Sequence, residues 1–397
     1  MRILHTSDWH IGKRLDQFSL QQAHEEFLDW LIDDQLAKVK PDLLVVSGDI
    51  YDKRIPSTES IELFEDTLDR IRALGVRTLI TAGNHDSRVR LGTNTRFMGP
   101  LGLHFRTKLN QITTPVEIEA DDHILLAYGI PYIEPDSDTG SDVNQWPVEP
   151  RHEAVLRHAV EKILEDVAHR QKKTSKPIKT LVASHAFIQS GVPSDSERNT
   201  KVGNLGEAPS SVFAGIDYVA MGHLHGFQNK ITAPGATVLR YSGSPIAFSF
   251  SERDHKKQIL SLEMTKDGVA EKSIESCDIP EFRGMIQLEG SLDEILSDAT
   301  PKSDKWAKII LTDTVMKSDV VETLRRKFPH LVEFSYQRQS AYGIESDGVR
   351  VSVNELRAEE VTRRFVEKVT GQPASDALGA VIDECCTALS LKISEDK

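Results

Sequence analysis

Cysteine, long apolar runs and basic charge are all scarce in this sequence. Only Cys277, Cys385 and Cys386 occur among 397 residues, which excludes a disulfide framework and a paired CxxC metal site. No N-terminal apolar stretch resembles a signal peptide, and no apolar run reaches transmembrane length. We therefore expect a reduced, cytoplasmic protein without membrane contact.

The deficit in basic charge limits how the chain could contact nucleic acid. Lys and Arg number 48 against 61 Asp and Glu, a net charge of -13, which argues against a broad basic footprint. Local basic patches, or a partner that supplies a basic surface, remain compatible with this balance. The length predicts two or three domains, and 27% charged with 39% hydrophobic residues is typical of a globular protein.

Short apolar runs alternate with amphipathic stretches over the N-terminal half of the chain. Strands are expected at 2–6, 43–46, 77–81, 123–128, 180–184 and 217–221, and helices at 20–39, 57–73 and 149–170. Ser19 is the expected N-cap of the first helix. Short connections between these elements predict right-handed βαβ units. Three later strands, at 228–232, 238–242 and 258–264, are expected to form a second, largely antiparallel sheet.

Residues with metal-ligand chemistry directly follow five of the expected strands. In chain order they are Asp8 and His10, Asp49 and Asp52, Asn84 with His85 and Asp86, His185, and His223 with His225. Because ligands of open α/β folds bind at the carboxyl ends of the strands, we expect these side chains to lie together. One histidine after a strand is usually a hydrogen-bonded structural residue, but five such groups at one edge favour a shared site.

A shared site of this composition requires cations. Carboxylates and imidazoles packed together without them would be costly to desolvate. Carboxylate, imidazole and amide ligands together suit Mn, Fe, Co or Zn better than Mg or Ca. Two ions about 3.5–4 Å apart need an anionic bridge. Asp49, which follows the buried strand 43–46 and Gly48, can supply one oxygen to each ion.

At these motifs the sequence resembles the calcineurin-like metallophosphoesterases, and within them the nuclease branch that works with an SMC-like ATPase. The resemblance rests on residues 1–10, 82–87, 194–198 and 241–245, and it covers residues 1–250. Phosphatases of this superfamily carry Arg-Gly after the second aspartate of Gly-Asp-x-x-Asp, whereas here Lys53 and Arg54 follow Asp52, which favours the nuclease branch. The implied fold is α/β, a sandwich of two mixed sheets flanked by helices.

The resemblance also implies a domain order and partners. Residues 1–277 would be the metallophosphoesterase nuclease domain, 278–338 an α+β capping domain that helps position DNA, 339–350 a linker, and 351–397 a helical region that docks on the ATPase. From the residues alone, two amphipathic helices at 356–369 and 375–391 are either a small folded hairpin or a partner-binding element. The resemblance further implies a homodimer of this chain within a heterotetramer.

The resemblance implies roles for individual residues. One ion would be held by Asp8, His10, Asp49 and His225, and the other by Asp49, Asn84, His185 and His223. Both ions would be manganese in the first place, with magnesium in part. His85 would stabilise the transition state or protonate the leaving ribose oxygen, and Asp86 would orient it. For Asp52 and Asp86, simple loop capping is the alternative.

The stretch 87–108 carries five basic residues and no acidic one, directly after residues 84–86. It is either a solvated loop and helix or a phosphate-tracking surface, in which Arg88 and Arg90 contact DNA.

The predicted function is a metal-dependent DNA exonuclease and endonuclease acting with an ATPase. One alternative is a phosphatase or small-molecule phosphodiesterase of the same superfamily, which would need neither a capping unit nor docking helices. The other is a non-enzymatic scaffold with a dead site. The presence of all seven candidate ligands and of His85 argues against the scaffold.

Overall fold

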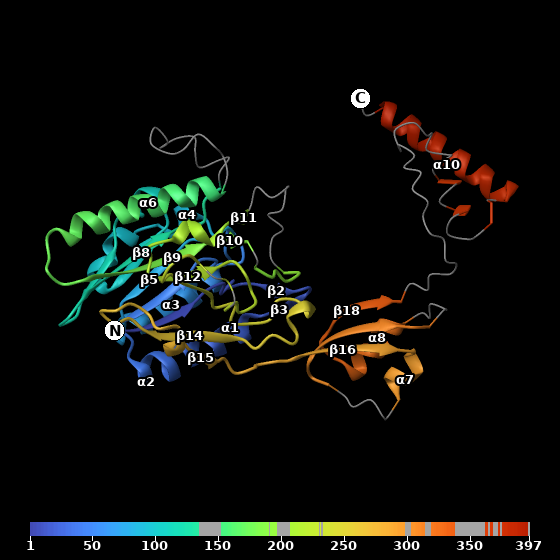
Figure 1. Cartoon of the computed structure of the whole chain (residues 1–397). Helices are drawn as coiled ribbons and strands as arrows, with labels where there is room; N and C mark the ends of the chain where they lie inside the picture. Colours follow the sequence, from blue (N-terminus) through green and yellow to red (C-terminus); the bar gives the residue numbers. More distant parts are fainter. Residues whose placement is uncertain are drawn as a thin grey trace. The chain divides into compact units, whose positions relative to one another are not determined.

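The computed structural model describes residues 1–134, 152–189, 191–196, 207–229, 231, 233–297, 303–313, 319–337, 362–363, 366–367, 372–373 and 375–395. The chain divides into two compact units, Met1–Gln337 and Arg338–Lys397. The first unit contains two mixed sheets with flanking helices, followed by a smaller α+β part (Figure 1).

The first sheet has six strands in the order β15-β14-β1-β4-β5-β6. These strands are Glu275–Asp278, Gln258–Glu263, Arg2–Thr6, Leu43–Ser47, Thr78–Thr81 and Leu103–Arg106. Strands β1, β4, β5 and β6 run parallel to one another, whereas β14 is antiparallel to β1 and β15 is antiparallel to β14. The carboxyl ends of β1, β4 and β5 therefore lie side by side at one edge of the sheet.

The second sheet has five strands in the order β13-β12-β9-β8-β7. They are Val238–Tyr241, Tyr218–Gly222, Ile178–His185, Ile124–Ile130 and Val116–Glu119. All neighbours are parallel except β7, which pairs antiparallel with β8. The fold is therefore the sandwich of two mixed sheets that the sequence predicts.

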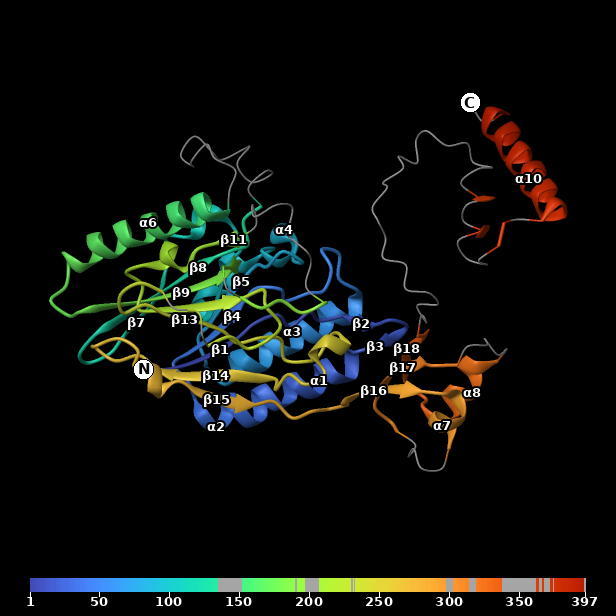
Figure 2. The same ribbon diagram turned by 45° about the vertical axis from the view of Figure 1, so that its right-hand side comes forward.

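Three apolar layers hold the sandwich together. Between the sheets, Leu43 and Val45 of β4 pack with Ala127 of β8 and Leu181 of β9. The outer face of the first sheet is covered by α1 (Gln21–Asp29), which continues through a π-helical stretch (Trp30–Leu36) into α2 (Ala37–Val39), and by α3 (Thr58–Ala73). The outer face of the second sheet is covered by α6 (His152–Gln171), as Figure 2 shows. Strand β4 is apolar on both faces because both of its faces are covered.

Several local predictions are confirmed and others are wrong. Ser57 caps α3 by accepting a hydrogen bond from the Ser60 amide, as expected for an N-cap. Ser19 is not the N-cap of α1: Leu20 holds that position, and the Ser19 hydroxyl accepts the Gln21 amide at 3.2 Å.

The predicted antiparallel sheet of strands 228–232, 238–242 and 258–264 is also wrong. β13 runs parallel to β12 in the second sheet, and β14 pairs with β1 in the first. Gln228 forms only an isolated bridge with Tyr241. Strands β6, β7 and β15 were not expected from the sequence. Alternation alone does not tell a strand which neighbour it will pair with, so these assignments depend on the whole fold.

The first unit also contains short elements that lie outside the two sheets of the sandwich. They are β2 (Arg14–Leu15), β3 (Phe18–Ser19), α4 (Arg88–Leu91), β10 (Phe187–Ile188) and β11 (Glu207–Ala208), with single 3-10 turns at Thr95–Phe97, Gly99–Leu101, Leu109–Gln111, Ser210–Phe213, Phe250–Glu252 and Glu271–Ser273. Residues 133–150 are rich in Pro, Asp and Ser, which predicts a long surface loop, but most of this stretch lies outside the described residues.

The α+β part consists of β16 (Met285–Gly290), α7 (Leu292–Leu296), β17 (Trp306–Leu311), α8 (Val320–Lys327) and β18 (Leu331–Tyr336). Its strands form a parallel sheet in the order β16-β17-β18. Ile309, Leu324 and Phe328 belong to a hydrophobic core of its own. The sequence predicts strands at 283–289, 306–312 and 332–336 and helices at 291–296 and 317–328, and each of these elements is present. The domain boundaries at 278 and 338 stay predictions.

In the second unit, α10 (Asp376–Glu395) matches the last expected helix. Of the preceding expected helix, 356–369, only residues 362–363 and 366–367 are described, and the predicted linker 339–350 lies outside the described residues. None of the described helices combines the length and apolarity that crossing a bilayer requires.

Candidate metal centre

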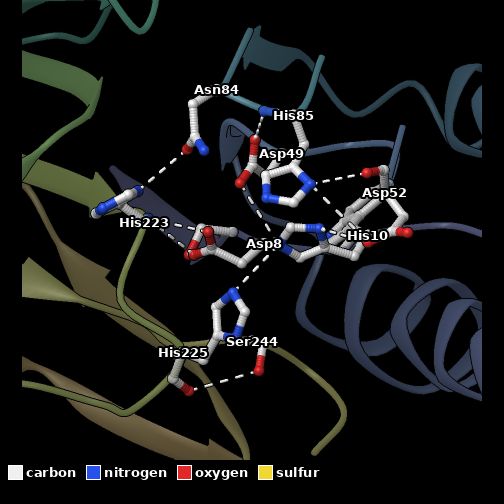
Figure 3. A network of polar contacts seen from close by, with 12 residues as sticks. Asp8, His10, Asp49, Asp52, Asn84, His85, His223, His225 and Ser244 are labelled. Carbon is white, nitrogen blue, oxygen red and sulfur yellow. Dashed lines mark hydrogen bonds and ion pairs between the residues drawn. The ribbon is translucent and has the colours of Figure 1, made fainter. Parts of the chain in front are cut away.

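The candidate ligands gather at the carboxyl ends of five strands drawn from both sheets (Figure 3). Asp8 and His10 follow β1, Asp49 follows β4, Asn84 follows β5, His185 ends β9, and His223 and His225 follow β12. All seven side chains are buried, the most exposed being Asn84 at 6%. The structure thus brings together every residue that the sequence placed in the metal site.

The backbone at this edge is strained. Asp8, His10, Asp49 and His223 adopt φ values of 53°, 47°, 51° and 110°. Conformations of this kind cost about 1–3 kcal/mol each for residues other than glycine, and they persist where the surrounding fold enforces them. The close approach also requires glycine: a Cβ at Gly83 would lie 2.1 Å from Asp49 Oδ1. Side-chain placement at this edge is therefore maintained at the expense of stability.

Two groups of donor atoms share Asp49. In the first group, His10 Nε2 lies 3.1 Å from His225 Nε2 and 3.4 Å from Asp49 Oδ2. Asp8, His10 and His225 each offer a donor atom within 4.8 Å of one another. In the second group, His185 Nε2 lies 3.3 Å from the same Asp49 oxygen. Asp49 Oδ2 thus faces one imidazole of each group.

The second group is completed by an amide and another imidazole. Asn84 Oδ1 lies 2.9 Å from His185 Nε2 and 3.1 Å from His223 Nδ1. The His223 amide donates to both oxygens of Asp8, at 2.9 and 3.1 Å, and Ser7 Oγ donates to Asp8 Oδ2 at 2.5 Å. These bonds fix Asp8 between the two groups.

The contacts of Asp49 fit a cation. His185 Nδ1 donates to the Ser47 carbonyl at 2.9 Å, so in the neutral ring Nε2 carries a lone pair and points at the Asp49 carboxylate. A carboxylate accepts only, so this contact needs a proton or a metal ion. Although burial lowers the pKa of His185, the Asp49 carboxylate raises it to about 9. Positive charge is therefore required at this point, and the donor set suits a divalent transition metal.

His85 is held beside the two groups rather than within them. Its amide donates to Asp49 Oδ1 at 2.8 Å, and its Nδ1 donates to the Asp52 carbonyl at 2.7 Å. The His85 ring lies 4.6 Å from the His10 ring, perpendicular to it. The hydrogen bond through Nδ1 fixes the ring and directs Nε2 away from Asp52.

Asp86 makes different contacts from those expected. Its carboxylate accepts the amides of Gly83, Ile50 and Tyr51 at 2.9, 3.1 and 3.0 Å. Among the described residues it has no hydrogen bond to His85, whose orientation comes from the Asp52 carbonyl. The contacts match the loop-capping alternative: Asp86 ties the loop after β5 to the loop after β4.

The basic stretch divides into exposed and buried residues. Ser87 caps α4 by accepting the Arg90 amide at 3.4 Å, and Arg90 is exposed while Arg88 is half-buried. Arg106 is buried in β6, where its Nε donates to the Thr114 carbonyl at 2.6 Å. Only part of the stretch is therefore available as a surface.

A buried polar network behind His225 was not expected from any sequence motif. Glu252 is fully buried and accepts from Ser196 and from Lys257, whose Nζ lies 2.5 Å from Glu252 Oε2. Ser196 Oγ lies 2.6 Å from His225 Nδ1. Ser196 belongs to a stretch that carries the family resemblance, but no motif spacing links it to residue 252.

The fold and the site agree with a comparison with protein families. The model of the calcineurin-like phosphoesterases matches residues 1–227 of the 397. The chain belongs to this family, a class of phosphoester hydrolases. A second model, described as the Type 5 capsule protein repressor C-terminal domain, matches residues 281–370.

Two similar proteins are both named as the D subunit of the nuclease SbcCD. The one from Staphylococcus saprophyticus subsp. saprophyticus is 24% identical over 394 residues, covering 98% of each chain. The one from Staphylococcus epidermidis is 26% identical over 338 residues, covering 84% of this chain and 85% of its own length.

Solved structures are more distant. TT1561 of Thermus thermophilus is 14% identical, with a TM-score of 0.37, over 70% of this chain and 99% of that one. A novel archaeal phosphodiesterase is 12% identical with a TM-score of 0.31 over the same shares. TM-scores this low carry no weight for the fold or function of this chain.

Proposed function

We propose that this chain is a metal-dependent DNA nuclease that cleaves double-strand ends and hairpins, acting with an SbcC-like ATPase of the SMC family in DNA repair, recombination and replication. The observation that carries the proposal is the match to two proteins named as the D subunit of the nuclease SbcCD, one of them aligned over 98% of both chains. An alignment of that length includes the residues beyond 280, which a hydrolase of small substrates does not need.

Two divalent ions per chain, manganese in the first place and magnesium in part, would bind at this centre. Asp8, His10, Asp49 and His225 would hold one ion, and Asp49, Asn84, His185 and His223 would hold the other. Bound divalent ions polarise a phosphodiester and lower the pKa of water at the site. Asp49 Oδ2 lies 3.4 Å from His10 Nε2 and 3.3 Å from His185 Nε2, which supports a role shared by the two groups through this one oxygen, and not through one oxygen for each ion as the sequence predicts. The other oxygen, Oδ1, accepts the His85 amide.

The chain's own residues orient the substrate and supply the proton. With Nδ1 bonded to the Asp52 carbonyl, His85 uses Nε2 to donate to the leaving ribose oxygen or to the charge that develops on the phosphate. Asp86 contributes by holding the two loops that carry Asp49 and His85. Arg88 and Arg90 contact the phosphates that flank the scissile one.

Two kinds of protein contact accompany this activity. The helical region 351–397 docks on the ATPase.

The segment 88–101 exposes Val89, Phe97 and Leu101 at 76%, 62% and 55%. Large exposed apolar side chains concentrated in one short segment are typical of an interface, and we assign this segment to a homodimer within the heterotetramer. Light scattering on the purified chain measures its oligomeric state. A monomer at micromolar concentration would contradict the homodimer.

The decisive test is cleavage of blunt-ended and hairpin DNA with manganese, with and without the ATPase, at a stated salt concentration. We expect cleavage that stops when the metal is chelated. Hydrolysis of bis-nitrophenyl phosphate without any DNA cleavage would instead favour a small-substrate phosphodiesterase. Two bound ions without activity on either substrate would favour a scaffold.

A further inference from the structure

We propose that Ser196 and Glu252 are positioning residues for His225, which hold its imidazole in the tautomer that presents Nε2 to the metal centre. This inference rests on the proposed metal-binding role of His225. It concerns a hydrogen-bonded network that lies behind the ligand, on the side away from the other donor atoms.

The direction of each hydrogen bond follows from the chemistry of the groups. Ser196 has one hydroxyl proton, and the Glu252 carboxylate, which Ser196 contacts, can only accept. The proton of Ser196 is therefore used on Glu252, and its oxygen is left to accept. Ser196 Oγ lies 2.6 Å from His225 Nδ1, so Nδ1 must be the donor. A neutral His225 then carries its lone pair on Nε2.

The carboxylate keeps its charge because a lysine lies against it. Lys257 Nζ donates to Glu252 Oε2 at 2.5 Å and to the His225 carbonyl at 3.0 Å. A charged acceptor is what keeps the Ser196 proton pointing away from His225.

The position of Nε2 gives the network its consequence. His225 Nε2 lies 3.1 Å from His10 Nε2, within the first group of donor atoms. The other tautomer would place a proton on Nε2 and remove one ligand from this group, while the group of Asn84, His185 and His223 would be unchanged. Groups that fix a ligating histidine in this way typically contribute about 10–100-fold to metal affinity.

The competing explanation is that the network only anchors the segment 191–196. That segment has a separate anchor, because the Asp195 amide donates to Ser251 Oγ at 3.0 Å. Ser251 is exposed and Asp195 does not contact His225 in the described part of the chain. Ser251→Ala is therefore a control that loosens the segment but keeps the Ser196 hydroxyl and its contact with His225 Nδ1. Ser251 also contacts Ser249, another donor to Glu252, so a small effect through Glu252 is part of this control.

The test is calorimetric titration of the metal-free full chain with manganese. We expect Ser196→Ala to lower the affinity for one of the two manganese ions by about 10–100-fold and to leave the affinity for the other unchanged. Ser196→Thr, which keeps the hydroxyl, should bind both ions with the affinities of the wild type. Ser251→Ala should do the same. Nitrogen NMR of the zinc-loaded chain should show the Nδ1–H signal of His225 shifted in Ser196→Ala.

Three results would overturn the inference: unchanged binding in Ser196→Ala, an equal loss of both ions with a lower melting temperature, or the same loss in Ser251→Ala. These are distinct from failure of the proposed function, in which the wild-type chain itself would bind no ions. Glu252→Gln gives a second variant, which keeps the size of the side chain and removes its charge. Glu252→Gln should lower the affinity for the same ion as Ser196→Ala does. A lower affinity for the other ion would contradict the proposal.

Discussion

Asp49 is the residue on which both halves of the candidate centre depend. Its Oδ2 faces His10 in one group and His185 in the other, and its Oδ1 accepts the His85 amide at 2.8 Å. A single carboxylate therefore contacts proposed ligands of both ions and the backbone of His85, the proposed general acid. Its backbone is left-handed, and the missing side chain of Gly83 leaves the space that the Asp49 amide and carboxylate occupy.

Asp49→Ala should abolish cleavage and lose at least one bound ion, because the bridge serves both groups. Metal content by mass spectrometry and a cleavage assay measure this. Asp34→Ala, which removes a carboxylate from an exposed ion pair with Lys38, is the control and should bind both ions. Two ions per chain and near-normal turnover in Asp49→Ala would refute the assignment.

His85→Leu should separate binding from chemistry. His85 lies beside the donor groups, so the variant should keep both ions and its affinity for DNA. Its rate should fall by about 10²–10⁴, the usual contribution of a general acid. Single-turnover cleavage and metal content decide the matter, and a variant that loses an ion would show that His85 is a ligand instead.

His5 should make the metal-free protein sensitive to acid. Its Nε2 donates to the Met221 carbonyl at 3.2 Å, and burial lowers its pKa from 6.5 to about 3. The unfolded chain then binds a proton below pH 6.5 that the folded chain does not. The stability present above pH 6.5 is therefore lost as the pH falls towards 3, by up to about 1.4 kcal/mol per pH unit.

Urea unfolding in chelator between pH 6.5 and 5 measures this contribution. The His5→Gln variant should show a slope shallower than that of the wild type by about that amount. His169→Gln, at an exposed position of α6, should keep the wild-type slope. Equal slopes in wild type and His5→Gln would contradict the prediction.

At the scale of elements, α4 is the structure that connects the metal centre to the surface. It begins at Arg88, directly after the loop that carries Asn84 and His85, and Ser87 is its N-cap. A nuclease must hold the phosphates on either side of the cleaved bond, and arginine does this with charge and a bidentate fork. The position of α4 suits this task.

Replacing Arg88 and Arg90 together with alanine should weaken DNA binding similarly for all sequences. The salt dependence should become shallower by about one unit of slope for each phosphate that the variant no longer neutralises. Hydrolysis of bis-nitrophenyl phosphate should change little, since the ligands remain.

The matched control replaces Arg70 and Arg72 of α3, which pair with Asp29 and Asp69 on the surface. Equal loss on both substrates in the α4 variant would indicate structural damage. Unchanged DNA binding would show that Arg88 and Arg90 do not contact DNA.

At the scale of the whole molecule, the division into two units suggests that catalysis and docking on the ATPase are separable. Met1–Gln337 forms one compact unit with the complete candidate site, and Arg338–Lys397 forms the other. The second unit carries α10 and no candidate ligand.

A chain that ends at Arg350 should therefore fold and hydrolyse bis-nitrophenyl phosphate like the full chain, but should no longer co-purify with its ATPase. Circular dichroism, hydrolysis rates and co-purification measure these outcomes. A stable complex formed by the truncated chain would refute the docking role of residues 351–397, and an unfolded product would refute the independence of the first unit.

Much of the candidate site could be predicted because its signals are local. The buried strand 43–46 ends at Gly48 and Asp49, and the same pattern of apolar run and ligand recurs at His185 and His223. Within each sheet, parallel strands bring such ends to one edge whatever their order. That the edges of two sheets, one with β1, β4 and β5 and the other with β9 and β12, meet at one site was decided by the tertiary structure. The strands and helices of the α+β part were predictable for a similar reason, since their apolar periodicity is complete within each element.

What the sequence determined by itself is thus the set of candidate ligands and the class of fold, because each is encoded within a few consecutive residues. Tertiary structure decided the pairing of β13 and β14: β14 pairs with β1 at the other end of this unit's sequence, and β13 runs parallel to β12, the strand directly before it, where an antiparallel pairing was expected. It also decided that Asp86 caps two loops and that Ser196 and Glu252 support His225. Asp86 meets backbone amides, and Ser196, Glu252 and His225 are side chains dozens of residues apart in the chain. Such groups bond to one another because burial removes the water that would otherwise bind them.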